Sequence, residues 1–260
     1  MLGYSRRINR PRQRQLNPFP NYSDDLNLRK GNPFLMPEYV NSLELSWQYR
    51  VKRNSLTLIG YHRDINQVIR RLTSIDSLGV STTTYENLAG SSNSGLEIIT
   101  SINPYKWWQI MLSADLYRQQ NDGTNIESDL NATAFSWSSR LVSSWKLDKG
   151  WQFQLIDRYR APIETIQGQF SGYRTADLTA QKSILKDKGT LSLRVSDIFD
   201  TRQFAFSTFC RSFEQDQVRK RESRNIYITF SYRVGKLEPS KKNRGNRGDG
   251  DSDFDDMDLE

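Results

Sequence analysis

The sequence contains very few of the residues on which most catalytic and metal sites depend. Among its 260 residues there is one histidine, His62, and one cysteine, Cys210. A single cysteine cannot form a disulfide within the chain, and a single histidine excludes a multi-histidine metal site and leaves no plain Ser/His/Asp triad. Glycine-rich phosphate-binding motifs are also missing. We therefore expect no enzyme, no metal site and no cofactor.

Hydrophobic residues are scarce, and long hydrophobic runs are absent. Only 36% of the residues are hydrophobic, and the mean hydropathy is −0.73. Because nowhere do about 18 apolar residues follow one another, we expect no transmembrane helix. The opening residues lack the apolar core of a signal peptide, which for an exported protein indicates a fragment or a truncated gene.

The abundant feature is an alternation of apolar and polar residues. A β-strand points successive side chains to opposite faces, so each alternating segment has one apolar and one polar face. Several segments run for about ten residues or more, whereas strands of soluble proteins cluster near about five or six. This favours a transmembrane β-barrel over a soluble sandwich. The apolar phases are Leu43, Leu45, Trp47, Tyr49 and Val51; Trp108, Ile110, Leu112, Ala114 and Leu116; Phe135, Trp137, Leu141, Trp145 and Leu147; and Ile226, Ile228, Phe230, Tyr232 and Val234.

The connections between these segments alternate between short turns and long polar links. Bacterial outer-membrane barrels have short periplasmic turns and long extracellular loops, so we expect the long links to form the external mouth. The short turns are 52–54, 104–106, 148–150 and 187–189, and the long links are 9–39, 70–94, 120–134 and 204–224, with a shorter one near 162–171. We expect an all-β, antiparallel barrel segment of about ten long strands, part of a larger barrel. The expected strands are 2–8, 40–52, 55–69, 95–103, 107–119, 135–147, 151–161, 172–185, 190–203 and 225–234.

The first and last of these strands would be the edges of the sheet. The strand at 2–8 is too short to pair fully with 225–234, so we expect an open or poorly sealed sheet.

This orientation predicts the positions of two sets of residues. Tryptophans near the short turns are expected to form the periplasmic aromatic girdle, because indole rings prefer the membrane–water boundary. Arginines in the polar phases are expected to face the lumen, because a charge facing lipid is costly. The girdle residues are Trp47, Trp107, Trp108, Trp145 and Trp151, and the lumen-facing candidates are Arg50, Arg140, Arg158, Arg160, Arg194 and Arg233.

Charge is distributed unevenly at the end of the chain. The net charge is +7, but the excess is scattered without a recognition helix or basic stripe, so we expect no nucleic-acid partner. Residues 236–260 are rich in charge and poor in apolar residues, which predicts a disordered, dispensable tail after a barrel domain at 1–235. Acidic residues from Asp249 to Glu260 fall partly at EF-hand spacing, but Phe254 occupies the position that requires glycine, and an acidic tail is the better interpretation.

Motifs at both ends of the barrel segment resemble the closing half of TonB-dependent receptors, in particular the outer-membrane β-barrel proteins abundant in Bacteroidota. The segments are 4–11, 16–19, 31–38, 195–202 and 231–235, and the loop residues that carry the resemblance are Arg10, Pro11, Asn17, Pro18, Phe19, Gly31, Asn32, Pro33, Pro37 and Glu38. The resemblance implies energised import through a barrel of about 22 strands that holds an N-terminal plug. This chain has about half of those strands, no plug and no TonB-contacting box.

We therefore expect the barrel of an outer-membrane receptor from a Gram-negative bacterium, performing TonB-dependent uptake of an unidentified ligand when complete. Its expected partners are outer-membrane lipid, the missing N-terminal barrel half and plug, and TonB through that missing region. Two alternatives remain open: a self-contained small barrel acting as a porin or adhesin, and a soluble basic β-protein that binds nucleic acid.

Overall fold

The computed structural model describes residues 1–128, 130–210 and 213–234. The predicted tail at 236–260, including its acidic run, lies outside the described residues. None of the helices in the described part is both long enough and apolar enough to span a membrane.

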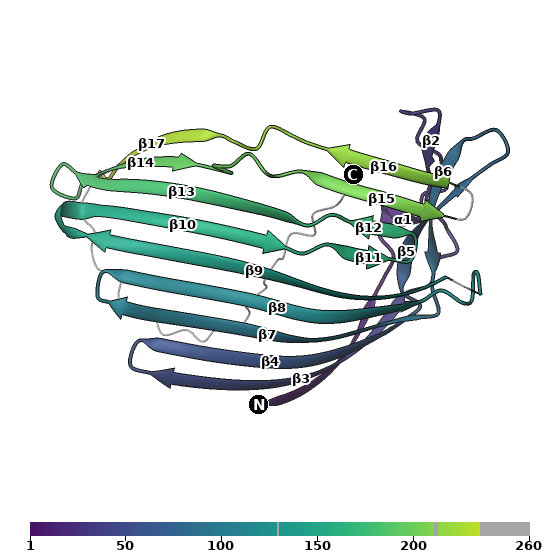
Figure 1. The fold of residues 1–260 in the computed structure, drawn as a ribbon, viewed down its shortest axis with the longest axis horizontal. Helices are drawn as coiled ribbons and strands as arrows, with labels where there is room; N and C mark the ends of the chain where they lie inside the picture. The colour runs from purple at the N-terminus through teal and green to yellow at the C-terminus, as the bar shows by residue number, and fades with distance from the viewer. Residues whose placement is uncertain (129, 211–212, 235–260) are drawn as a thin grey trace.

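One large sheet dominates the molecule, and it confirms the all-β, antiparallel fold. Ten strands follow one another in chain order across it, and every neighbouring pair is antiparallel. Figure 1 shows the curved sheet with its short hairpins at the left. Each strand corresponds to one predicted from the sequence. They are β1 (Leu2–Asn9), β3 (Glu38–Val51), β4 (Asn54–Asn66), β7 (Gly90–Tyr105), β8 (Trp108–Asp122), β9 (Asn131–Leu147), β10 (Trp151–Arg160), β13 (Tyr173–Ile184), β14 (Gly189–Val195) and β17 (Ile226–Tyr232).

Two strand ends differ from the prediction because the backbone turns at a residue with positive φ. The strand predicted at 190–203 ends at Val195, since Asp197 (φ 44°) and Asp200 (φ 53°) lie in the left-handed region. The strand predicted at 55–69 ends at Asn66, before Gln67 (φ 59°). Left-handed residues interrupt a ladder, and neither was recognisable from the apolar pattern.

The long links were expected to be loops, and this was wrong for the links at 9–39, 70–94, 162–171 and 204–224, because they contribute strands to two further sheets. One sheet joins β2 (Asn27–Arg29), β6 (Ser81–Asn87) and β5 (Ile69–Ile75). The other joins β11 (Ile163–Thr165), β12 (Gly168–Phe170), β15 (Phe204–Cys210) and β16 (Phe213–Arg219). Both lie at the end of the main sheet opposite the short hairpins, beside the short helix α1 (Gln13–Leu16) (Figure 1). A 3-10 turn, η1 (Asp148–Gly150), closes one of the short hairpins.

A small apolar cluster ties these sheets to the main one. Val68, Leu88 and Leu130 are its buried residues, and Ile65 of β4 and Ile166 between β11 and β12 pack against it. The cluster therefore contains residues from four different long links or strand ends, and it fixes the small sheets relative to the main sheet.

The pairing register places all the predicted apolar phases on one face of the main sheet. Leu45 pairs with Gly60, and Gly60 pairs with Leu96. The same parity continues through Leu116 and Trp137 and, at the other edge, through Leu193 and Ile228. Leu45 is 61% exposed and Ile228 is 75% exposed. An apolar face of this extent, which no described element covers, fits contact with lipid.

The main sheet is open. Within the described residues, β1 and β17 are its two edges, and no ladder joins them. This agrees with the expectation that 2–8 and 225–234 do not pair. Both edges present free backbone N–H and C=O groups, which an outer-membrane barrel satisfies with further strands.

Candidate functional site

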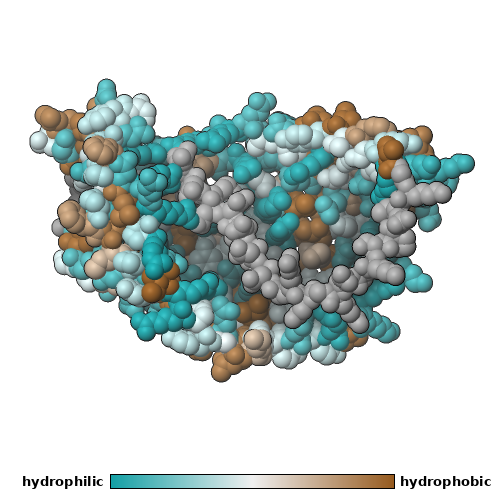
Figure 2. Space-filling view, turned by 180° about the vertical axis from the view of Figure 1, so that it is seen from behind, coloured by the Kyte–Doolittle hydropathy of each residue, from teal (hydrophilic) through white to brown (hydrophobic). Residues whose placement is uncertain are grey.

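A cavity of about 1180 Å³ lies between the two small sheets, at the end of the main sheet that carries the long links. Its walls come from β2, β5 and β6 on one side and from β12, β15 and β16 on the other. Figure 2 shows hydrophilic and hydrophobic residues side by side on the visible face at this end of the molecule. The site is thus built from links that are far apart in the sequence.

Strand alternation brings several arginines to the cavity wall. Arg29 of β2 pairs with Thr83, which pairs in turn with Thr73, and all three side chains line the cavity. Arg71 of β5 lies two residues before Thr73 and therefore on the same face of the sheet. On the opposite wall, Arg219 of β16 pairs with Phe204 of β15. Paired residues share a face of their sheet, so each small sheet presents one alternating set to the cavity.

Positive charge predominates in the cavity. Its described lining contains seven arginines and two carboxylates, which are Asp24 and Glu38. Burial lowers the pKa of Arg29, and the neighbouring charges of Arg219 and Arg71 lower it further. Both causes disfavour the charged form of Arg29, because it is partly removed from water and lies beside like charges.

The two carboxylates are engaged by local hydrogen bonds. Glu38 accepts the backbone N–H of Ile69 at 2.7 Å and the side-chain amide of Asn9 at 3.2 Å. Asp24 accepts the backbone N–H of Leu26 at 3.1 Å and the side-chain amide of Asn27 at 3.0 Å. These hydrogen bonds hold both carboxylates in place at the cavity.

Aromatic rings form part of the same wall. Phe170 lies 4.4 Å from Phe206 and 5.6 Å from Phe204, measured between ring centroids. Across the cavity the Nε atom of Arg71 donates to the hydroxyl of Tyr85 at 3.2 Å, with the guanidinium over the ring. The cavity can therefore contact both charged groups and a carbon skeleton.

The loop from Arg10 to Glu38, which carries the family resemblance, lies at the rim of the cavity. The backbone N–H groups of Gly31 and Asn32 each donate at 2.7 Å, to the carbonyl oxygens of Asn17 and Gln15. A Cβ on Gly31 would lie 2.5 Å from the carbonyl oxygen of Gln15, so only glycine fits at this crossing. The side-chain amide of Asn32 also donates to the carbonyl oxygen of Tyr85 at 3.0 Å.

The other motif residues are dispersed along this loop. Arg10 lines the cavity, and Glu38 begins β3. Phe19 is 78% exposed. Pro11, Pro18, Pro33 and Pro37 flank the contacts between the two halves of the loop.

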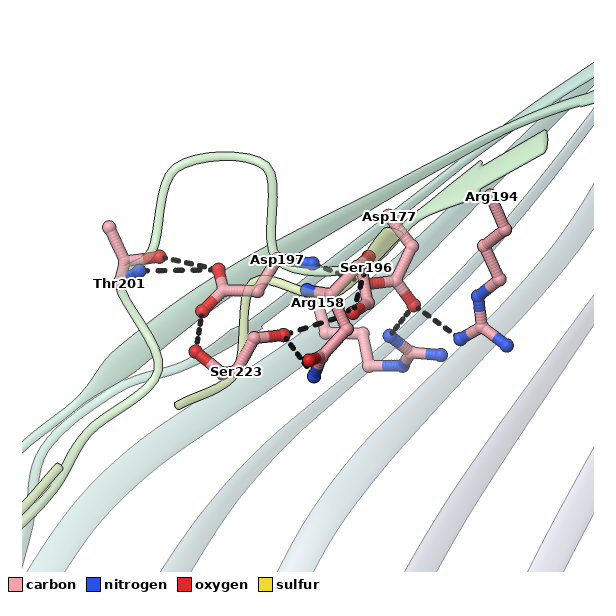
Figure 3. A network of polar contacts seen from close by, with 8 residues as sticks. Arg158, Asp177, Arg194, Ser196, Asp197, Thr201 and Ser223 are labelled. Atoms are coloured by element: carbon pink, nitrogen blue, oxygen red, sulfur yellow. Dashed lines mark hydrogen bonds and ion pairs between the residues drawn. The ribbon is translucent and has the colours of Figure 1, made fainter. Parts of the chain in front are cut away.

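Near the long-link ends of β10, β13 and β14, the polar face of the main sheet carries an ion-pair cluster (Figure 3). The Asp177 carboxylate of β13 accepts from Arg158 of β10 at 3.2 Å and from Arg194 of β14 at 3.1 Å. It also accepts the backbone N–H of Asp197 at 3.0 Å. One carboxylate thereby joins three strands and the segment that leaves β14.

A second carboxylate, Asp197, holds that segment in place. It accepts from the Ser223 hydroxyl at 2.5 Å and from the backbone N–H groups of Thr201 at 3.2 Å and Arg202 at 2.9 Å. Burial alone would raise the pKa of Asp197, but these hydrogen bonds outweigh it and lower the pKa below its ordinary value. The motif at 195–202 was identified from the sequence, but these roles were not, because the partners lie in distant segments.

The structure brings together some of the predicted lumen arginines and separates others. Arg140 and Arg158 are cross-strand partners, and Arg158 and Arg194 share Asp177. Arg50 lies near the short turn after β3, and Arg160 ends β10. The remaining candidate, Arg233, follows β17 and donates its backbone N–H to the carbonyl oxygen of Lys188. All six have the parity of the polar face; their contact with a lumen stays a prediction.

The predicted girdle tryptophans all lie at the short-hairpin end. Trp47 stacks on Tyr49 with centroids 5.9 Å apart, and Trp107 stacks on Trp108 at 6.1 Å. Trp145 pairs with Trp108, and Trp151 stacks on Phe153 at 5.7 Å. Their position at a membrane boundary stays a prediction.

A second aromatic group was missed. Trp137 of β9 lies 4.5 Å from Tyr159 of β10, eight residues along β9 from Trp145 and on the same face. The alternating apolar phase of β9 includes Trp137, but its distance from a short turn excluded it from the predicted girdle.

Comparisons with known proteins can now be set beside this geometry. The model of the outer membrane protein beta-barrel family matches residues 1–232. No curated protein matches the chain by sequence. Among solved structures, a copper transporter, OprC, is similar with a TM-score of 0.61 and 16% sequence identity. The similarity covers 89% of this chain but only 37% of the transporter chain, and at this identity it shows the fold alone. With nearly all of its described length matched by the family model, the chain belongs to the outer membrane protein beta-barrel family, and the expected location in the outer membrane is confirmed.

Proposed function

We propose that this chain is the ligand-capturing barrel segment of an outer-membrane receptor that imports its ligand with energy delivered through TonB. In this proposal the chain forms the C-terminal half of the barrel, of the type abundant in Bacteroidota. The remaining strands, the plug and the TonB-contacting segment would belong to the rest of the receptor. Outer-membrane lipid would contact the apolar face.

The observation that carries the proposal is the position of the cavity. It lies at the long-link end of the main sheet, the end at which the polar face carries Arg158, Asp177 and Arg194. A ligand captured in the cavity would enter a space lined by polar side chains. Concave, largely preformed cavities with a few convergent charged groups are the usual form of binding sites. We assign the chain a role in binding and import rather than in catalysis.

The rival small barrel would have to close on itself. It needs a ladder between β1 and β17, and the described residues form none. The open edges instead favour pairing with further strands, as in a larger barrel.

Depletion of solutes from a defined medium tests the proposal, with mass spectrometry as the readout. Cells that express the full-length protein, cells that lack it and cells that lack TonB are compared. We expect at least one solute to be depleted only when both the protein and TonB are present. Depletion that requires the protein but not TonB would contradict the energised mechanism. Identical depletion by all three strains would contradict import altogether.

A further inference from the structure

We propose that the cavity between the small sheets binds an organic anion that carries two or more phosphate, sulfate or carboxylate groups. The inference rests on the proposed function, because it takes this cavity as the site of ligand capture and names the chemical class of the ligand. Three features support it: arginines converge on the cavity from separate elements, Arg29 and Arg219 have no carboxylate within ion-pair distance among the described residues, and apolar rings line the same wall.

The arginines reach the cavity from segments far apart in the chain. Arg29 comes from β2, Arg71 from β5 and Arg219 from β16. They lie close enough that the charges of Arg219 and Arg71 both act on Arg29. Bringing the like charges of Arg29 and Arg219 together opposes folding, and an anion bound between them would offset the repulsion.

Several arginines of the main sheet have carboxylate partners. Arg158 and Arg194 share Asp177, and Arg174 pairs with Asp157. Arg29 and Arg219 differ from these arginines. Within the part of the chain that the structure describes, no carboxylate lies within ion-pair distance of Arg29 or Arg219. The guanidinium groups therefore keep their fork of N–H donors for a planar or tetrahedral oxyanion.

The dimensions of the site favour a ligand with several anionic groups on a carbon framework. The volume of about 1180 Å³ far exceeds that of a single phosphate, and arginines line both walls. Two anionic groups on one molecule could contact Arg29 on one wall and Arg219 on the other. The rings of Phe204 and Phe206, on the same face as Arg219, provide apolar contact for the part of the ligand between them.

Calorimetric titration of the full-length protein, purified from outer membranes in detergent, tests the inference. The probes are inositol hexakisphosphate, a sulfated hexasaccharide and citrate, which distinguish phosphate, sulfate and carboxylate sources, with neutral maltohexaose as the uncharged comparison. The variants are Arg29→Gln, Arg219→Gln and Arg29→Lys. Arg53→Gln is the matched control, because Arg53 is an exposed arginine in the short turn at the opposite end of the sheet. Circular dichroism verifies the β-content of each variant.

We expect at least one polyanion to bind and maltohexaose not to bind. Each Arg→Gln substitution at the cavity should weaken binding by about tenfold or more, since charge-assisted hydrogen bonds are lost. Arg29→Lys should retain part of the affinity, Arg53→Gln should retain all of it, and salt should weaken it throughout.

Failure of all three polyanions to bind the folded protein would overturn the inference, as would an affinity that Arg29→Gln and Arg219→Gln leave unchanged. Binding without TonB-dependent depletion of any solute would instead overturn the proposed function and leave the inference standing. TonB-dependent depletion limited to neutral solutes would overturn the inference and leave the proposed function standing.

Discussion

The Nε atom of Arg174 lies 2.9 Å from the Oδ2 atom of Asp157, on the face of the main sheet that otherwise carries mostly apolar side chains. Leu141 and Ala176 are the cross-strand partners of Asp157. The Asp157 side chain is 17% exposed and that of Arg174 is 63% exposed. The pairing would lower the cost of placing a carboxylate on the face that we expect to meet lipid, where the long arginine side chain could reach toward the boundary of the membrane.

Removing one partner of this ion pair should lower the free energy of unfolding more than replacing both partners. Arg174→Ala leaves the Asp157 carboxylate without its partner, and we expect it to lower the free energy of unfolding by about 1–3 kcal/mol. The double variant Asp157→Asn with Arg174→Ala should be less destabilised than the single variant. Urea unfolding in lipid vesicles measures both. Equal or additive losses would show that the two side chains act independently.

The two faces of β3 should respond oppositely to charge. Leu45→Arg places a cation on the apolar face and should block membrane insertion, because arginine at the membrane midplane costs about 2–4 kcal/mol. Ser46→Arg, one residue farther on the polar face, should insert normally. A membrane-integration assay distinguishes them, and Leu193→Arg with Ser192→Arg on β14 repeats the comparison. Similar insertion of both members of a pair would refute the assignment of faces.

Acid should loosen the segment that follows β14. The pKa of Asp197 is lower in the folded protein than its ordinary value of 3.8. A carboxylate with a lowered pKa stabilises the fold above the unfolded value, and this contribution is lost as the pH falls through the folded pKa. Stability should therefore be constant near neutral pH and fall below about pH 4.

The variant Asp197→Asn tests whether Asp197 causes the loss of stability in acid. It loses a charged acceptor and should be less stable by about 1–3 kcal/mol at pH 7, with a weaker decline in acid. Asp148→Asn, in the η1 turn, is the charge-matched control. Thermal unfolding between pH 3 and pH 7 measures the stability of both variants. If stability falls as steeply with decreasing pH in Asp197→Asn as in the unchanged protein, Asp197 is not the source of the acid sensitivity.

Gly31 should be intolerant of a side chain, whereas Gly60 should accept one. A Cβ on Gly31 would meet the backbone of Gln15 and Asn17 at 2.5–2.7 Å, whereas a Cβ on Gly60 would meet nothing within 4 Å. We expect Gly31→Ala to disturb the cavity rim, weakening anion binding severalfold while the main sheet unfolds at an unchanged temperature. Gly60→Ala should change neither property. Unaltered binding by Gly31→Ala would show that this loop crossing does not shape the cavity.

The main sheet was predictable from the sequence because its signal is local. Alternation along each strand determines which residues share a face, and Leu45, Leu116 and Ile228 were assigned correctly from their own neighbours alone. The small sheets were not predictable, since β2 is short and pairs in parallel with β6, more than fifty residues later. The cavity was missed for the same reason: Arg29 and Arg219 have no sequence relationship that brings them together. The lumen arginines were selected by parity, but their shared partner Asp177 was not.

A hydrogen bond from the side-chain amide of Gln215 to the Oδ1 atom of Asn27, at 3.2 Å, spans 188 positions of the chain and connects the two small sheets. Contacts of such long range form late in folding, because the entropy of closing the intervening chain is lost before the contact contributes. We therefore expect the cavity to form after the hairpins of the main sheet, so that affinity for a ligand would report whether folding has been completed. A bound ligand would in turn stabilise the matured form by mass action, so receptors that fold in its presence should survive proteolysis longer than receptors that fold without it.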